Sequence, residues 1–346
     1  MNTPTIVVGV TTSDRPTIAR PHEISIVIPV YQGATTLASV VEELAALTRE
    51  FRTPEGHRAR LSEVLLVHDC GPDGSDAVIR ELQAKHPWVR ALWLSRNFGQ
   101  HPATLAGMAS SGGDWVVTMD EDGQHDPAFI GAMLDTAMAQ RASVVYALPT
   151  NPPPHGFARN LASRAAKKVV AVAVGQADIG TFQSFRLVLG ESARSVAAYA
   201  GAGVYLDVAL GWVAGRPAQC AVVSREEGGR RSGYSLRRLL SHFWRMVISS
   251  GTRGLRIVSA LGVTFAAVGL LWAASLVVAR IGGGAVPHGW TSIIVIVLVG
   301  TGAVLFSLGV IAEYVGVSVN LALGKPPYLL VSDPSAGPFG RSPHDA

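Results

Sequence analysis

The most constraining feature of this sequence is an apolar run that leads directly into acidic and amide side chains. Residues 115–119 are mostly β-prone, and Asp120, Asp122 and Gln124 follow at alternate positions. Pro127, a residue common in the first turn of a helix, comes next. The carboxylates are therefore expected at the carboxyl end of a strand, where open α/β sheets bind ligands. Their hard oxygens suit Mg²⁺ or Mn²⁺ on a diphosphate, although an acidic turn that only caps the helix is the alternative.

The chain around this run alternates between apolar segments of strand length and segments with helical spacing. The expected strands are 24–30, 61–67, 89–94, 115–119 and 144–147, and the expected helices are 35–50, 76–85, 102–110 and 127–140. Alternation with continuous apolar strands predicts a mostly parallel sheet covered by helices on both faces.

Three further strands in this pattern also end in polar turns that contain glycine. Tyr31, Asp69 and Asn97 lie in these turns, and parallel strands bring all such turns to one edge of the sheet. An aspartate there can accept hydrogen bonds from a nucleotide, and Tyr31 can pack against its ring. Taken singly, each turn could be a mere connection.

The C-terminal third contains two uncharged apolar segments, residues 257–279 and 290–312. Each can cross about 30 Å of hydrocarbon as a helix at about 1.5 Å per residue, so two membrane spans are predicted, with a buried soluble hairpin as the alternative. Arginines cluster before the first span, whereas the loop between the spans has Arg280 alone, which predicts a cytoplasmic N-terminal domain in the plasma (inner) membrane. The net charge of +4 is modest and no nucleic-acid motif is present, so nucleic acid is not expected as a partner.

Basic side chains gather in the segments that precede the first span. Residues 159–169 and 236–248 have the pattern of basic amphipathic helices at a membrane surface. Between them, residues 225–235 form a glycine-rich loop dense in arginine. Guanidinium groups on flexible backbone suit phosphate, and a solvated basic loop is the alternative.

The motifs 26–31, 68–75, 96–99 and 120–125 together resemble the family 2 inverting glycosyltransferases of the GT-A fold. Within that family the chain is similar to the polyprenyl-phosphate glycosyltransferases, relatives of dolichol-phosphate mannose synthase with two C-terminal spans. The resemblance covers residues 24–330. It implies inverting, metal-dependent transfer of a sugar from a nucleotide-diphosphate sugar to polyprenyl phosphate.

The resemblance also assigns roles to individual residues. Asp122 and Gln124 would hold the divalent metal, with Asp120 contacting ribose or a metal-bound water. The donor nucleotide would be bordered by Pro29, Tyr31, Asp69, Asn97 and Asp120. The acceptor phosphate would be held by Arg159, Arg164, Arg225, Arg230, Arg231, Ser232 and Tyr234. The expected catalytic residues are Asp120, Asp122, Gln124 and Arg231.

Two departures from the family pattern fall near the expected base pocket. Members commonly have an acidic pair where this chain has His68 and Asp69, and often Glu where it has Gly33. A non-catalytic membrane scaffold that binds nucleotide sugar or lipid is therefore an alternative. A processive polysaccharide synthase is a further one, but it needs more spans and usually a Gln-x-x-Arg-Trp motif, which this chain lacks.

These inferences give one expected organisation. It comprises a flexible leader (1–20), the GT-A domain (21–235), a juxtamembrane amphipathic helix (236–256), two spans (257–279 and 290–312) and a cytoplasmic tail (313–346). The expected partners are a nucleotide-diphosphate sugar, polyprenyl phosphate, the lipid bilayer and further copies of the chain in a homo-oligomer.

Overall fold

Strand β1 (His22–Val30) lies at the centre of the sheet in the computed structural model. The structure describes residues 20–150, 182–201, 203–223, 225, 253–281 and 289–337. The remaining strands are β2 (Phe51–Arg52), β3 (Arg58–His68), β4 (Val89–Leu94), β5 (Trp115–Thr118), β6 (Val144–Pro149), β7 (Arg186–Leu189), β8 (Ala218–Val222) and β9 (Leu330–Val331).

Helices connect these strands in the alternating pattern that the sequence predicts. They are α1 (Leu37–Leu44), α2 (Ser75–Lys85), α3 (Gln100–Ser110), α4 (Ile130–Gln140), α6 (Gly190–Tyr199), α7 (Leu206–Val213), α9 (Arg253–Ile281) and α10 (Trp290–Ala322). Two 3₁₀ turns, η1 (Ala45–Thr48) and η2 (Pro127–Phe129), complete the predicted helices 35–50 and 127–140.

The strand order is β8-β6-β7-β5-β1-β3-β4-β9, with β2 paired to β3. Strand β1 pairs in parallel with both β3 and β5, and β3 pairs in parallel with β4. The mostly parallel α/β sheet is thus confirmed. Strand β7 enters it antiparallel between β5 and β6, and β9 pairs antiparallel with β4.

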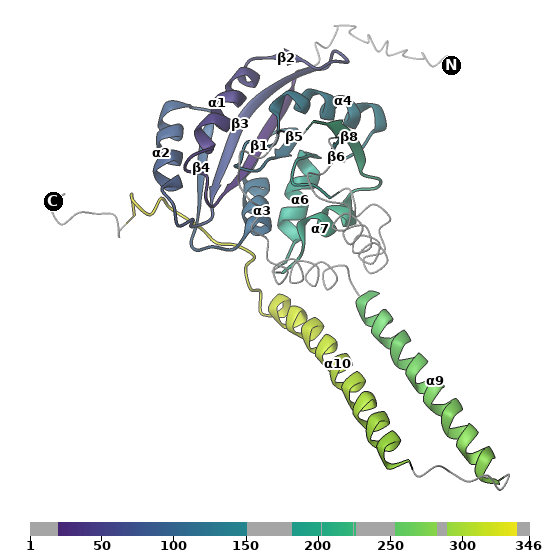
Figure 1. The fold of residues 1–346 in the computed structure, drawn as a ribbon. Coiled ribbons are helices and arrows are strands. Elements are labelled where there is room, and N and C mark those ends of the chain that lie inside the picture. Colours follow the sequence, from purple (N-terminus) through teal and green to yellow (C-terminus); the bar gives the residue numbers. More distant parts are fainter. Residues whose placement is uncertain are drawn as a thin grey trace, which may run out of the picture.

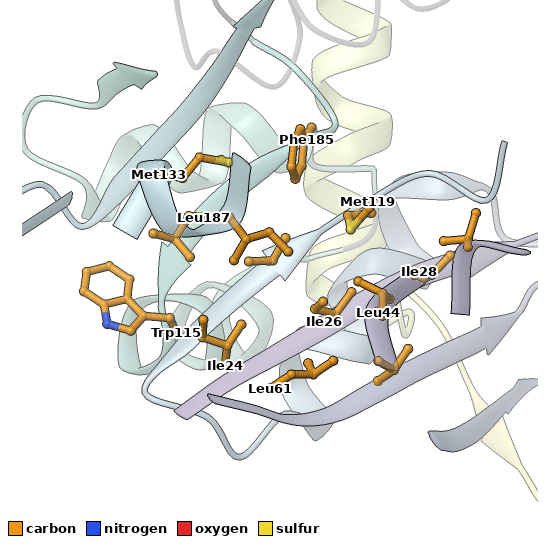
Figure 2. Close-up of a cluster of buried hydrophobic side chains, with 14 of the residues drawn as sticks. Ile24, Ile26, Ile28, Leu44, Leu61, Trp115, Met119, Met133, Phe185 and Leu187 are labelled. Carbon is orange, nitrogen blue, oxygen red and sulfur yellow. The ribbon is translucent and has the colours of Figure 1, made fainter. Parts of the chain in front are cut away.

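Alternate residues of β1 face two separate cores, one on each side of the sheet. Ile24, Ile26 and Ile28 join the core beneath α1, α2 and α4, which Figure 2 shows with Leu61, Trp115 and Leu187. Val27 points to the other core, beneath α3, α6 and α7. Helix α3 packs closely on that face, because a Cβ at Gly107 would lie 2.3 Å from Val27 Cγ1. Figure 1 shows the helices on both faces.

The two long helices α9 and α10 lie side by side, away from the sheet (Figure 1). The predicted spans 257–279 and 290–312 fall within them. Among the described residues, Val299–Asn320 of α10 is long and apolar enough to cross a membrane, and only 6% of its most apolar window is buried. Helix α9 has a shorter apolar stretch, Val258–Gly269, so the span expected at 257–279 stays a prediction.

The predicted tail begins differently from the expectation. Helix α10 continues past residue 312 to Ala322, because Glu313 is a single charge in an otherwise apolar helix. The chain then returns to the sheet and forms β9. The juxtamembrane helix predicted at 236–256 lies outside the described residues, except for its last four positions, which begin α9. The leader, residues 1–20, is described only at Arg20.

One buried ion pair joins β7 to α7 inside the core beneath α3, α6 and α7. Arg186 donates to Asp207, and Tyr146 donates to the same carboxylate at 3.0 Å. Arg186 also donates to Thr118 Oγ1 at 3.0 Å. Burial raises the pKa of Asp207, and the neighbouring Arg186 charge opposes that shift.

We expect Asp207→Leu to lower the thermal midpoint of unfolding of the full-length protein. It leaves the Arg186 charge buried without its carboxylate, and breaking a buried pair in this way costs about 3–5 kcal/mol. The matched double variant Asp207→Leu/Arg186→Met removes both charges and should recover most of that loss. Thermal unfolding in detergent measures both, and an unchanged midpoint in Asp207→Leu would contradict the role given to the pair.

Candidate functional site

Four polar turns lie at one edge of the sheet, as the sequence predicts. They follow β1, β3, β4 and β5, whose parallel pairing places their carboxyl ends together. The turns after β1 and β3 are in direct contact, because a Cβ at Gly71 would lie 1.6 Å from the carbonyl oxygen of Tyr31. Asp73 accepts the backbone N–H of Ala34 at 3.0 Å and joins the same two turns.

Asp120, the first carboxylate after β5, is held by side chains from two other parts of the fold. Gln100 Nε2 donates to Asp120 Oδ1 at 2.6 Å, and Ser184 Oγ donates to Oδ2 at 2.5 Å. The backbone N–H of Asp120 donates to His125 Nδ1 at 3.0 Å, and the His125 ring stacks on Phe185. The orientation of Asp120 is therefore fixed from α3, from the residues before β7, and from its own loop.

Asp122 and Gln124, the predicted metal ligands, lie in the same loop. The backbone N–H of Gln124 donates to Asp122 Oδ1 at 3.0 Å, and the Asp122 side chain is exposed. A carboxylate and an amide oxygen at this spacing fit a hard divalent cation, which prefers oxygen ligands. Neighbouring carboxylates at 120 and 121 add negative charge that favours a cation at this position.

Glu121, between the two aspartates, points to the turn after β1. Its carboxylate accepts the backbone N–H of Tyr31 and of Gln32, both at 2.9 Å, and its backbone oxygen accepts Thr36 Oγ1 at 2.6 Å. Burial raises the pKa of Glu121, and the two N–H donors oppose that shift.

Gly33 provides the space for this contact. A Cβ at residue 33 would lie 2.7 Å from Glu121 Oε2. The departure from the family pattern at Gly33 therefore has a structural reason, since the carboxylate that fills this space comes from Glu121.

The donor-side residues take different positions at this edge. Tyr31 and Asn97 are exposed, and Pro29 is half-buried in β1. Asp69 is buried, and its carboxylate accepts the N–H of Phe98 at 2.7 Å and of Gly99 at 2.8 Å. Asp69 thus shapes the turn that carries Asn97.

His68, the other departure from the family pattern, is buried at the end of β3. Its ring packs on Trp93, with centroids 5.2 Å apart, and its Nε2 finds no hydrogen-bond partner in the described part of the chain. Burial lowers the pKa of His68. The side chain is therefore part of the packing between β3 and β4.

Arg225, one of the predicted acceptor residues, lies beside the loop that carries the predicted metal ligands. Its backbone N–H donates to the Gln124 carbonyl oxygen at 3.1 Å, and its guanidinium pairs with Glu43 at 2.7 Å and with Asp126 at 3.2 Å. Glu43 raises the pKa of Arg225. The other predicted acceptor residues lie outside the described residues: Arg159, Arg164, Arg230, Arg231, Ser232 and Tyr234.

A second group of possible metal ligands lies at the opposite edge of the sheet. Glu55, His57 and Asp135 have ligand atoms within 4.8 Å of one another. His57 contacts His22 at the start of β1, far from the turns that carry Asp120 and Tyr31. The Asp135 carboxylate already accepts Thr53 Oγ1 and the Glu55 N–H, so it closes the turn between β2 and β3.

Sequence reasoning missed the residues that contact Asp120 and Arg225. Gln100, Ser184 and His125 contact Asp120, and Glu43 and Asp126 contact Arg225. Ser184 and Gln100 are far from residue 120 in the sequence, so no spacing rule brings them together. His125 was visible as part of the motif 120–125, but its bond to the Asp120 N–H was not.

Part of the chain matches a known protein family. Residues 25–193 match the family described as Glycosyl transferase family 2. The matched segment contains most of β1, the predicted metal ligands and β7. The chain therefore contains a family 2 glycosyltransferase domain with a GT-A type sheet.

Relatives along most of the chain include transferases with a named acceptor. The undecaprenyl-phosphate 4-deoxy-4-formamido-L-arabinose transferase of Pseudomonas fluorescens (strain SBW25) is 27% identical, over 89% of this chain and 89% of the relative. An uncharacterized glycosyltransferase of Bacillus subtilis (strain 168), YkcC, is 26% identical, over 90% of this chain and 94% of the relative.

Two solved structures are also similar to this chain. One is the mannosyltransferase PcManGT of Pyrobaculum calidifontis in complex with GDP-Man and Mn²⁺, with 16% identity, a TM-score of 0.47, and coverage of 83% of this chain and 81% of that chain. The other is glucosyl-3-phosphoglycerate synthase of Mycobacterium tuberculosis with Mn²⁺ and UDP, with 16% identity, a TM-score of 0.47, and coverage of 67% and 78%.

We expect Glu121→Ala to weaken binding of the donor nucleotide. The backbone N–H groups of Tyr31 and Gln32 lose their acceptor, so the turn beside the nucleotide loses its fixed shape. Glu63→Ala is the matched control, because Glu63 accepts the Gly112 N–H in the same way, but near the start of β5. Calorimetry with nucleotide sugars gives both affinities, and equal affinity in Glu121→Ala and the unchanged protein would disprove this role.

Proposed function

We propose that the chain transfers a sugar from a nucleoside-diphosphate sugar to polyprenyl phosphate, with inversion at the anomeric carbon, at the cytoplasmic face of a membrane. The observation that carries the proposal is the loop after β5. It fixes Asp120 through Gln100 and Ser184 and leaves Asp122 exposed beside the turns that carry Tyr31 and Asn97. Family membership and the named acceptor of the relatives support the same reaction.

The donor would lie across the edge where these turns meet. Asp122 and Gln124 would hold a divalent cation, which supplies charge neutralisation for a leaving nucleoside diphosphate. Asp120, fixed by its two donors, would accept from the ribose or from a water on the cation. Tyr31 and Asn97 are exposed at the same edge and would border the nucleotide.

The acceptor needs no strong general base. A phosphate monoester has a second pKa near ~6, so its oxygen is anionic at neutral pH and can attack the anomeric carbon directly. The protein then has to position two anionic groups and offset their repulsion. Arg159, Arg164 and Arg231 would hold the incoming phosphate on the face opposite the leaving group. From an α-linked donor this gives a β-linked glycosyl phospholipid.

Arg225 would bind the acceptor phosphate only if its guanidinium gave up its present carboxylate partners. Its guanidinium is paired with Glu43 and Asp126 beside the Gln124 carbonyl, and a phosphate would have to replace these carboxylates. Arg225 is 41% exposed at its side chain, so a ligand can reach it.

A non-catalytic scaffold that binds nucleotide sugar or lipid is the second candidate, from a different functional class. The two departures that suggested it, Gly33 and His68, have structural explanations in the contact with Glu121 and the packing on Trp93. A scaffold would show no transfer and no metal-dependent binding of a nucleotide sugar.

We expect Asp122→Asn to lower turnover by a factor of about 10² or more, as the loss of one preorganised electrostatic contact does elsewhere. Asp114→Asn is the matched control, because Asp114 precedes the same strand at the opposite edge. Transfer of labelled sugar from a panel of nucleotide sugars to polyprenyl phosphate measures both variants. Full activity of Asp122→Asn, or of the unchanged protein in EDTA, would refute the metal assignment.

We expect Arg231→Ala to raise the apparent KM for polyprenyl phosphate and to leave the KM for the donor almost unchanged. Arg231→Lys should restore activity only in part, because an ammonium keeps the charge but lacks the bidentate geometry of a guanidinium. Kinetics with each substrate varied in turn separate the two constants. A rise in the donor KM alone would instead place Arg231 on the donor diphosphate.

A further inference from the structure

Strand β9, which follows the membrane helix α10, completes the edge of the sheet. Val331 pairs with Trp93 and Leu330 pairs with Leu94, in antiparallel register. The backbone N–H of Ser95 donates to the Leu329 carbonyl oxygen at 2.9 Å. The pairing therefore reaches the first residue of the turn that carries Asn97.

An ion pair reinforces this strand. Arg80 of α2 donates to both oxygens of Asp333, with Nε–Oδ2 at 2.9 Å and Nη2–Oδ1 at 3.0 Å. The Arg80 guanidinium also lies over the Trp93 ring, 4.9 Å from its centroid. Its hydrogen bonds lower the pKa of Asp333 to about 2, so the pair is charged at neutral pH.

The connection between α10 and β9 is short and has defined ends. Helix α10 ends at Ala322, and Gly324 follows with a φ of +64°, a left-handed conformation that suits glycine at a helix end. Residues 323–329 can span at most about 25 Å when fully extended. Tyr328, within this connection, packs against the core beneath α3, α6 and α7.

The direction of β9 decides which edge of the sheet the helix approaches. Strand β4 runs toward the edge that carries Asn97, and β9 is antiparallel to it, so the chain enters β9 from that same edge. In Figure 1 the yellow segment after α10 passes beside β4. The end of α10 therefore lies on the side of the sheet where Tyr31, Asn97 and Asp122 lie.

We propose that β9 and the Arg80–Asp333 pair form a clamp that holds the carboxyl edge of the sheet toward the bilayer, where a lipid phosphate emerges. Arg80 and Asp333 are positioning residues in this scheme. The expected effect of the clamp on catalysis rests on the proposed function. The orientation of the sheet edge toward the bilayer can be measured without any sugar transfer. The competing explanation is that β9 only covers an exposed sheet edge.

The test uses full-length protein in vesicles of phosphatidylethanolamine and phosphatidylglycerol. The variants are Arg80→Asp, Asp333→Arg and the double exchange of both charges. Arg58→Asp is the matched control, because it breaks another exposed ion pair, with Glu50, away from β9. Transfer is measured to a long-chain polyprenyl phosphate in the vesicles and to a water-soluble short-chain prenyl phosphate.

We expect each single variant to lower kcat/KM for the long-chain acceptor about ten- to a hundredfold, the range that remote misplacement produces. The kcat/KM for the short-chain acceptor and the KM for the donor should both stay within about twofold of the unchanged protein, since use of a soluble acceptor does not depend on orientation at the membrane. The double exchange should restore long-chain transfer. Equal losses with both acceptors, or no loss in either single variant, would overturn the clamp.

Orientation is measured separately, by energy transfer from a dye at the carboxyl edge to dye-labelled lipid. The dye is placed on Gln32→Cys, an exposed position, in a Cys70→Ser background. The efficiency of energy transfer between the dyes should fall in both single variants and return in the double exchange. Unchanged efficiency would overturn the clamp even if catalysis changed. A protein with no transferase activity but with this pattern would disprove the proposed function and support the clamp.

Discussion

The arrangement of the site depends on how the carboxylates after β5 are satisfied. Glu121 accepts hydrogen bonds from two backbone N–H groups of the turn after β1, and Asp120 accepts hydrogen bonds from Gln100 of α3 and from Ser184, two residues before β7. A carboxylate that accepts such bonds is held in place, and removing its donors would leave buried charge unsatisfied. Three neighbouring carboxylates would otherwise repel one another in a flexible loop. With Asp120 and Glu121 fixed by protein donors, Asp122 is directed outward, where a cation and a diphosphate can reach it.

The sequence predicted the repetitive part of the fold and the edge on which the site lies. Apolar strands such as 24–30 leave a clear pattern, because residues on both faces are buried, and the alternation with helices then places Tyr31 and Asp120 at one edge. Strand β9 has only two residues and exposed side chains, so periodicity carries no signal for it. The bond between Glu121 and Tyr31 joins residues 90 positions apart, which spacing alone does not reveal.

The two departures from the family pattern show why a local motif is an incomplete guide to a pocket. Gly33 looks like the loss of a side chain, yet the space is filled by Glu121 from the loop after β5. His68 looks like a change in the base pocket, yet its ring is buried against Trp93. Trp93 in turn pairs with β9 and lies beneath the Arg80 guanidinium. The side chain at residue 68 is therefore tied to the sheet edge that β9 completes.

The negative charge at the carboxyl edge of the sheet explains why the proposed reaction needs both arginines and a cation. If the carboxyl edge faces the bilayer, Asp120, Glu121 and Asp122 face a surface that is itself negative when anionic lipids are present, and a lipid phosphate adds further charge. Exposed charges interact strongly only within a Debye length of about 8 Å at physiological salt, so the offsetting charges have to lie at the site. In the proposed scheme a cation on Asp122 would supply part of that charge on the donor side. In the proposed scheme the arginine-rich segment 225–235 would supply it on the acceptor side, and the backbone N–H of Arg225 donates to the Gln124 carbonyl oxygen beside the predicted metal ligands.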